Sequence, residues 1–96
     1  MGAINQEPNR VQEKIRVQRV QTGVRIEKRL LKVLKALAEY FDITLGDLLE
    51  GIVLHAFDGK APFTDEETLQ RIADLKRIYG VEYDSSASHN FIEEER

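Results

Sequence analysis

The side chains with the clearest chemistry in this sequence are lysines and arginines crowded into one stretch. Residues 10–37 carry nine of them against two glutamates, a net charge of +7. Residues 38–96 carry five basic and fourteen acidic residues, a net charge of −9, and the whole chain has a net charge of −3. A field of one sign in one half of a chain attracts a partner of the opposite sign. We therefore expect the basic half to bind an anionic partner; the alternative is that the two halves neutralise each other within the fold.

Other chemistry is sparse. The sequence has no cysteine, and its only histidines, His55 and His89, do not have the spacing of a metal-binding pair. It also has no phosphate-binding loop, no glycine-rich dinucleotide turn, no HExxH and no GxSxG. We expect a protein that is not an enzyme and that binds no metal or cofactor.

The basic stretch contains a strand pattern. β-Branched residues alternate with other residues over 20–26, which is typical of a β-strand: Val20, Thr22, Val24 and Ile26 against Gln21, Gly23 and Arg25. Ile15 and Val17 also alternate, but with the opposite parity. A single long strand would therefore need a bulge near Gln18, or residues 11–18 form a separate arm or short helix.

Three helices are predicted after this strand. The first spans about 27–40, where apolar residues recur every three or four positions. The second begins at Thr44, a capping residue, and ends at Asp58-Gly59; its apolar stripe is broader than one partner helix needs. The third, about 65–79, is opened by the capping box Thr64-x-x-Glu67 and stopped by Gly80.

These elements divide the chain into a flexible arm over 1–13, a domain over 14–59 and an extension over 60–96. The extension ends in an acidic tail that we expect to be flexible, with Tyr83 or Phe91-Ile92 as the residues that could dock. The predicted fold class is mainly α with one short β-strand. No stretch has the length of a membrane span and the start lacks the pattern of a signal peptide, so a soluble cytoplasmic protein is expected.

One strand of about seven residues cannot satisfy its own backbone hydrogen bonds. Because no second strand is predicted before the helices, the partner we expect is a second copy of the same strand. Two copies would form an antiparallel two-stranded ribbon in a twofold-symmetric homodimer. Val24 and Ile26 would then face the helices, and Gln21, Gly23 and Arg25 would face outward.

The segment from Thr22 to Ile26, the lysine- and leucine-rich helix and the segment from Thr44 to Leu49 resemble ribbon-helix-helix proteins of the Arc, MetJ and CopG class. The resemblance covers residues 19–57. It implies an intertwined homodimer whose ribbon enters the major groove of double-stranded DNA, and hence a sequence-specific transcriptional repressor, with further assembly of dimers on DNA possible.

The resemblance also implies which residues contact DNA. The base-contacting candidates are Gln21, Gly23 and Arg25, although glycine offers no side chain, so it either allows close backbone approach or weakens specificity. The amides and hydroxyl at the start of the second helix are expected to bind phosphate, together with nearby basic side chains. The phosphate-contacting candidates are Arg16, Arg19, Lys28, Arg29, Thr44, Leu45 and Gly46.

Two other functions fit the same elements. The protein could be an antitoxin, with the ribbon on DNA and residues 60–96 folding onto a toxin. It could also be a dimerisation or adaptor domain without any DNA role, which Gly23 and the acidic overall charge favour.

Overall fold

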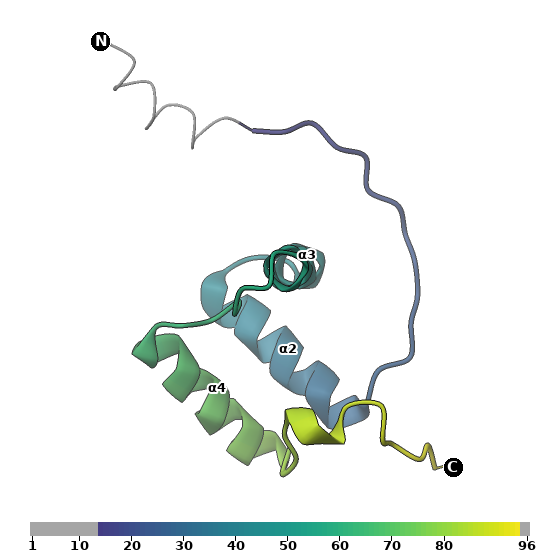
Figure 1. Ribbon diagram of the computed structural model, residues 1–96, viewed down its shortest axis with the longest axis vertical. Helices are drawn as coiled ribbons and strands as arrows, with labels where there is room; N and C mark the ends of the chain where they lie inside the picture. The colour runs from purple at the N-terminus through teal and green to yellow at the C-terminus, as the bar shows by residue number, and fades with distance from the viewer. Residues whose placement is uncertain (1–13, 95–96) are drawn as a thin grey trace.

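The computed structural model describes residues 14–94, so the predicted arm over 1–13 lies outside the described residues. Three α-helices follow one another, α2 (Lys28–Phe41), α3 (Leu45–Phe57) and α4 (Glu66–Tyr79), and a short 3-10 helix, η1, spans Ser85–Ala87. Figure 1 shows α4 beside α2, α3 crossing α2, and residues 14–27 running around the outside of the helices. None of the helices in this part of the chain is long and apolar enough to cross a membrane.

The single chain is all-α, and no β-strand is present within residues 14–94. The predicted strand over 20–26 is exposed or half-buried chain without a regular element, and residues 14–18 form neither a strand nor a short helix. A strand exists only through hydrogen bonds to a neighbouring strand. The neighbour predicted for this strand is the same strand of a second copy, so the ribbon cannot form within one chain.

The predicted signals at helix ends are confirmed at two places. The Thr44 hydroxyl accepts a hydrogen bond from the Asp47 amide at 3.0 Å, which caps α3 as expected. Gly80 follows α4 with a left-handed backbone (φ 76°), and its amide bonds back to the Arg77 carbonyl. The third helix therefore ends where the sequence predicted, at Tyr79, with Gly80 as its cap.

Two helix starts differ from the prediction. The cap of α4 is Asp65 rather than Thr64, because the Asp65 carboxylate accepts a hydrogen bond from the Thr68 amide at 2.9 Å. The cap of α2 is Glu27, which the sequence analysis had placed inside the helix. Aspartate is among the strongest capping residues, whereas glutamate is unusual there, so only the second of these differences is unexpected.

A small core lies where the three helices meet. Leu37 and Ala38 of α2 and Leu48 of α3 are buried, and Leu37 is only 2% exposed. Six half-buried apolar residues surround them: Leu34, Phe41, Ile52, Phe63, Ile72 and Leu75. The last two lie on α4, so the third helix packs on its own chain.

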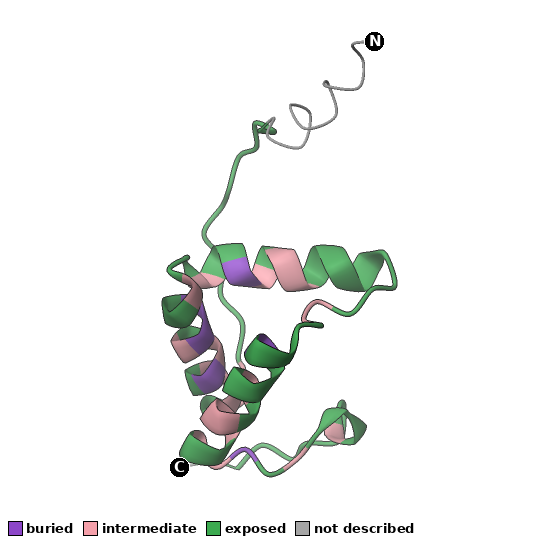
Figure 2. Cartoon of the chain, turned by 90° about the vertical axis from the view of Figure 1, so that its left-hand side faces the viewer, coloured by how far each residue is buried: buried purple, intermediate pink, exposed green. Residues whose placement is uncertain are grey.

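The core covers only part of α3. Figure 2 shows this helix buried near its start and exposed toward its C-terminal end. The apolar residues Val53, Leu54 and Phe57 are exposed there, and Phe57 is 81% exposed. The broad apolar stripe that the sequence indicated on this helix is therefore only half used by the single chain.

Candidate nucleic-acid interface

The predicted base-contacting residues lie in the exposed segment before α2. Gln21, Gly23 and Arg25 are all exposed. The space where a Cβ atom of Gly23 would lie is open, with no atom within 4 Å. Neighbouring Val20 and Val24 are also exposed, at 84% and 74%, so in one chain both faces of the alternating pattern meet solvent.

Arg25 is paired with a carboxylate of its own chain. Its guanidinium forms an ion pair with Glu93, and both side chains are largely exposed. The acidic C-terminal segment thus reaches the residue that the resemblance assigns to base contact.

Arg19 holds the N-terminal segment against α3. Its guanidinium donates two hydrogen bonds to the Glu50 carboxylate, at 2.8 and 2.7 Å. The hydrogen bond from Arg19 lowers the pKa of Glu50, and the same bond raises the pKa of Arg19. Arg19 is therefore engaged within the chain, while the other two candidates flanking the strand, Arg16 and Lys28, are exposed and pair with none of the described residues.

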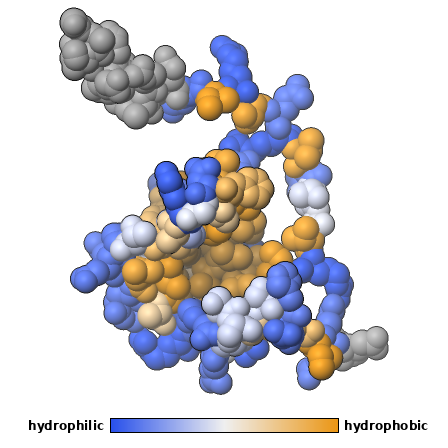
Figure 3. Space-filling model, in the orientation of Figure 1, coloured by the Kyte–Doolittle hydropathy of each residue, from blue (hydrophilic) through white to orange (hydrophobic). Residues whose placement is uncertain are grey.

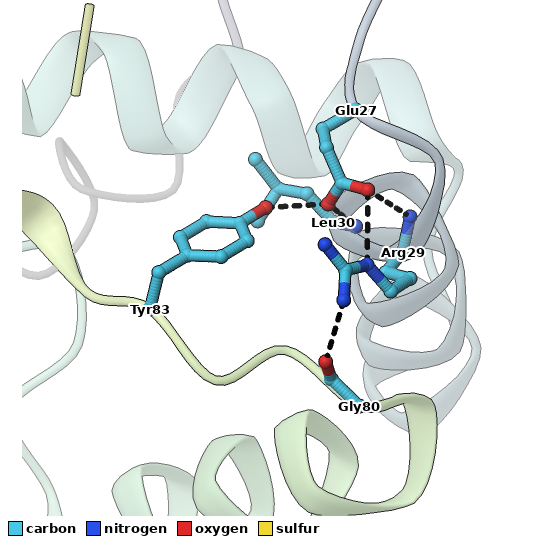
Figure 4. A network of polar contacts seen from close by, with 5 residues as sticks. All are labelled: Glu27, Arg29, Leu30, Gly80 and Tyr83. Carbon is cyan, nitrogen blue, oxygen red and sulfur yellow. Dashed lines mark hydrogen bonds and ion pairs between the residues drawn. The ribbon is translucent and has the colours of Figure 1, made fainter. Parts of the chain in front are cut away.

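Arg29 belongs to a polar network at the start of α2 (Figure 4). Its guanidinium bonds to the Glu27 carboxylate at 3.1 Å and to the Gly80 carbonyl at 3.0 Å. It also lies 5.8 Å from the centre of the Tyr83 ring. The Tyr83 hydroxyl in turn donates to Glu27 at 2.5 Å. In the single chain, Arg29 ties the C-terminal segment to α2 rather than standing free for phosphate.

Glu27 is the centre of this network. Its carboxylate also accepts the backbone amides of Arg29 and Leu30, at 3.2 and 3.1 Å. Burial by itself raises the pKa of Glu27, but the hydrogen bonds from Tyr83, Arg29 and Leu30 outweigh it and lower the pKa to about 2. Burial, and then the bond to Glu27, raise the pKa of Tyr83.

The start of α3 offers a second polar site. The first amides of a helix have no partner within it, and here they belong to the segment Leu45–Gly46. Thr44 and Gly46 are exposed and Leu45 is half-buried. Because Glu50 lies less than two helical turns further on, the Arg19–Glu50 pair brings the basic segment near this helix start.

The structure also shows roles that the sequence analysis missed. Glu27 was expected inside the first helix and not as its cap, although its position just before an apolar run is the available signal of a cap. The docking of Tyr83 was one of the two possibilities considered, whereas the pairing of Arg25 with Glu93 was not predicted. Elsewhere, His55 donates from Nδ1 to the Gly51 carbonyl at 2.7 Å. Within residues 14–94, no three acidic, histidine or cysteine side chains gather as a metal site would require.

The chain was compared with models of known protein families, with curated proteins and with solved structures, and none of them matches it. The resemblance to ribbon-helix-helix proteins therefore depends on residues 19–57 of this sequence alone.

Proposed function

We propose that this chain forms a homodimer that binds double-stranded DNA and acts as a transcriptional repressor of the ribbon-helix-helix type. The observation that carries the proposal is the state of residues 20–26 in one chain. Their apolar side chains, Val20 and Val24, are exposed directly beside the outward candidates Gln21 and Arg25. A strand of alternating apolar and polar residues is stabilised most when its apolar face is buried and its polar face stays accessible, as in a ribbon paired with a second copy.

The exposed half of α3 supports dimerisation. Val53, Leu54 and Phe57 form an apolar surface that one chain leaves open. Figure 3 shows apolar side chains gathered over α2 and α3 on the face around which the N-terminal segment runs. Burying one large apolar side chain is worth about 1.5–3 kcal/mol, so a symmetric pair of these surfaces supplies a substantial driving force.

The basic character of the same segment supports DNA as the partner. A two-stranded ribbon fits the major groove, where an arginine can bond to guanine and a glutamine to adenine. Arg16 and Lys28 flank the ribbon segment and are exposed, as phosphate contacts require. The free amides at the start of α3 suit a phosphate group.

The proposal is tested by a salt titration of DNA affinity. The full chain is titrated onto a mixed-sequence duplex of about three helical turns, and the affinity is followed by fluorescence anisotropy. Because phosphate contacts release counterions, log affinity should fall linearly with log salt concentration. Binding that is absent at low salt, or that does not change with salt, would contradict the proposal.

Specific contact by Arg25 is tested on a duplex selected from a randomised pool. Arg25→Ala should weaken this complex by about 1–3 kcal/mol and relax the preference at one base pair. Lys60→Ala removes one positive charge from the loop after α3 and serves as the control. Equal losses in both variants would mean that Arg25 contributes only its charge.

A dimerisation domain without DNA binding is the second candidate. It is favoured by the pairing of Arg19, Arg25 and Arg29 with carboxylates of the same chain. This candidate predicts a stable dimer in sedimentation equilibrium with no DNA binding at low salt. The antitoxin hypothesis has less support, because Ile72 and Leu75 of α4 already pack in the core of their own chain.

A further inference from the structure

We propose that the C-terminal segment, residues 81–94, is a tethered competitor of DNA that occupies Arg25 through Glu93. The inference rests on the proposed function, since it concerns the residue assigned to base contact. A carboxylate on Nη2 of Arg25 competes for the donors that a bidentate contact with guanine uses, and its negative charge repels a phosphate. The segment therefore weakens DNA binding until the Arg25–Glu93 pair opens.

The position of the segment does not depend on the Arg25–Glu93 pair alone. Val81 is buried, and the Tyr83 hydroxyl donates a hydrogen bond to Glu27. Arg25 lies two residues before Glu27 in the sequence. Figure 4 shows Tyr83 pointing at Glu27 beside the guanidinium of Arg29. These contacts hold the acidic end of the chain next to the basic segment.

A second ring continues this anchor toward Glu93. Phe91 packs edge to face on Tyr83, with ring centres 5.0 Å apart. Phe91 is two residues before Glu93, so the aromatic pair fixes the chain just ahead of the carboxylate. The carboxylate is thereby delivered to Arg25 at a high effective concentration.

The Arg25–Glu93 ion pair is weak enough for DNA to displace Glu93. The Arg25 side chain is 84% exposed and that of Glu93 is 64% exposed. Solvent screens such a pair, which favours the closed arrangement by a factor of only about 1.5 to 5. Only the open fraction binds DNA, so each copy weakens binding by about 2.5-fold to sixfold and the two copies of a dimer by about sixfold to thirty-six-fold, and this inhibition should shrink as salt rises.

The test compares DNA affinities of full-length variants on the mixed-sequence duplex at low salt. Glu93→Gln removes the competing charge and keeps the side-chain shape. Glu39→Gln is the matched control, because Glu39 is exposed near the end of α2, some 18 Å along the helix from Glu27. Glu93→Gln should tighten DNA binding by about sixfold to thirty-six-fold more than Glu39→Gln.

The Arg25→Ala background shows whether the effect acts through Arg25. There, Glu93→Gln and Glu39→Gln should change the affinity equally, because only the change in net charge remains. Tyr83→Phe alters no charge but removes the bond to Glu27, and in the Arg25-containing chain it should also tighten binding.

Three results overturn the inference. If the Glu93 and Glu39 variants bind DNA equally in the Arg25-containing chain, there is no competition, although the proposed function stands. If the excess effect persists in the Arg25→Ala background, Glu93 acts by general repulsion and not on Arg25. If no variant binds DNA at low salt, the inference fails together with the proposed function.

Discussion

The two halves of α3 lie in opposite surroundings although both are rich in apolar residues. Near its start, Leu48 is buried against Leu37 and Ala38 of α2. Near its end, Leu54 and Phe57 are exposed. The first half has α2 as its neighbour, whereas the second half is exposed and has no element packed over it among the described residues (Figure 2).

This chain therefore has two apolar surfaces, one packed within the chain and one left exposed by it. The core at the meeting point of the helices is completed within the chain, because α4 supplies Ile72 and Leu75. The other surface, Val53, Leu54 and Phe57, is left exposed by the single chain, and the proposed function pairs the segment 20–26 with a second copy. Apolar side chains exposed together are typical of an interaction site, and the proposed dimer would cover both the end of α3 and the segment 20–26.

A charge in the exposed apolar surface of α3 has the largest expected effect, which is on the stability of the proposed dimer. Phe57→Asp places a charge in the apolar surface that the proposed dimer would bury, once in each subunit. If each lost side-chain burial costs about 1.5–3 kcal/mol, the two together weaken the dimer by about 3–6 kcal/mol. Sedimentation equilibrium should show a monomer, and circular dichroism should show the helices retained, because Phe57 is exposed in the single chain.

Leu69→Asp is the control for this variant, since Leu69 is a partly exposed residue of α4. It should leave the dimer intact. A dimer that survives Phe57→Asp, or that Leu69→Asp disrupts equally, would place the contact elsewhere.

A cavity in the core where the helices meet has the next largest expected effect, which is on the free energy of unfolding. Leu37→Ala removes the most deeply buried large side chain and should lower the free energy of unfolding by about 2–5 kcal/mol. The measurement is urea unfolding in the Phe57→Asp background, where unfolding is not coupled to dissociation. A loss that appears only in the dimer would show that Leu37 belongs to the contact between subunits and not to a core of its own chain.

The three helices were predicted well from the sequence. Spacing of three and four placed all three helices, and the chemistry of Thr44 and Gly80 marked a start and an end correctly. The broad stripe on α3 also indicated that its apolar residues exceed what one chain buries. These features are local, so a few neighbouring residues determine them.

Contacts between distant residues were not predictable in the same way. Tyr83 bonds to Glu27 across 56 residues, and Arg25 pairs with Glu93 from the other end of the chain. Periodicity carries no information about which distant side chains meet. For this reason the contacts of Arg19 with Glu50 and of Arg29 with Glu27 were not predicted, and the phosphate contacts expected of these two arginines stay a prediction.

The polar network around Glu27 joins the packed helices to the segment before them, so its stability can be tested by changing the pH. The pKa of Glu27 is about 2 in the folded chain against an ordinary value of 4.5. A lowered pKa stabilises the fold fully above pH 4.5, and the contribution is lost as the pH falls toward 2. After allowance for solvent screening, we expect about 1–3 kcal/mol.

The measurement is urea unfolding of the wild-type chain and of Glu27→Gln at several pH values. Wild type should be the more stable above pH 4.5, and the difference should shrink toward pH 2. Tyr83→Phe should give a smaller difference, because it removes only one of the hydrogen bonds to Glu27. A difference that does not change with pH would mean that the carboxylate is not held in its charged form.

Thr44, which caps the start of α3, gives the smallest expected effect. Thr44→Ala removes the acceptor of the Asp47 amide and should cost about 1 kcal/mol of stability, whereas Thr44→Ser should restore it. If the first amides of α3 also hold a DNA phosphate, DNA affinity should fall in the alanine variant and recover with serine. The slope of log affinity against log salt should stay the same, because no cationic side chain is lost. A changed slope would instead mean that Thr44 acts through the placement of Arg16 or Lys28, and an unchanged affinity would remove the start of α3 from the DNA contact.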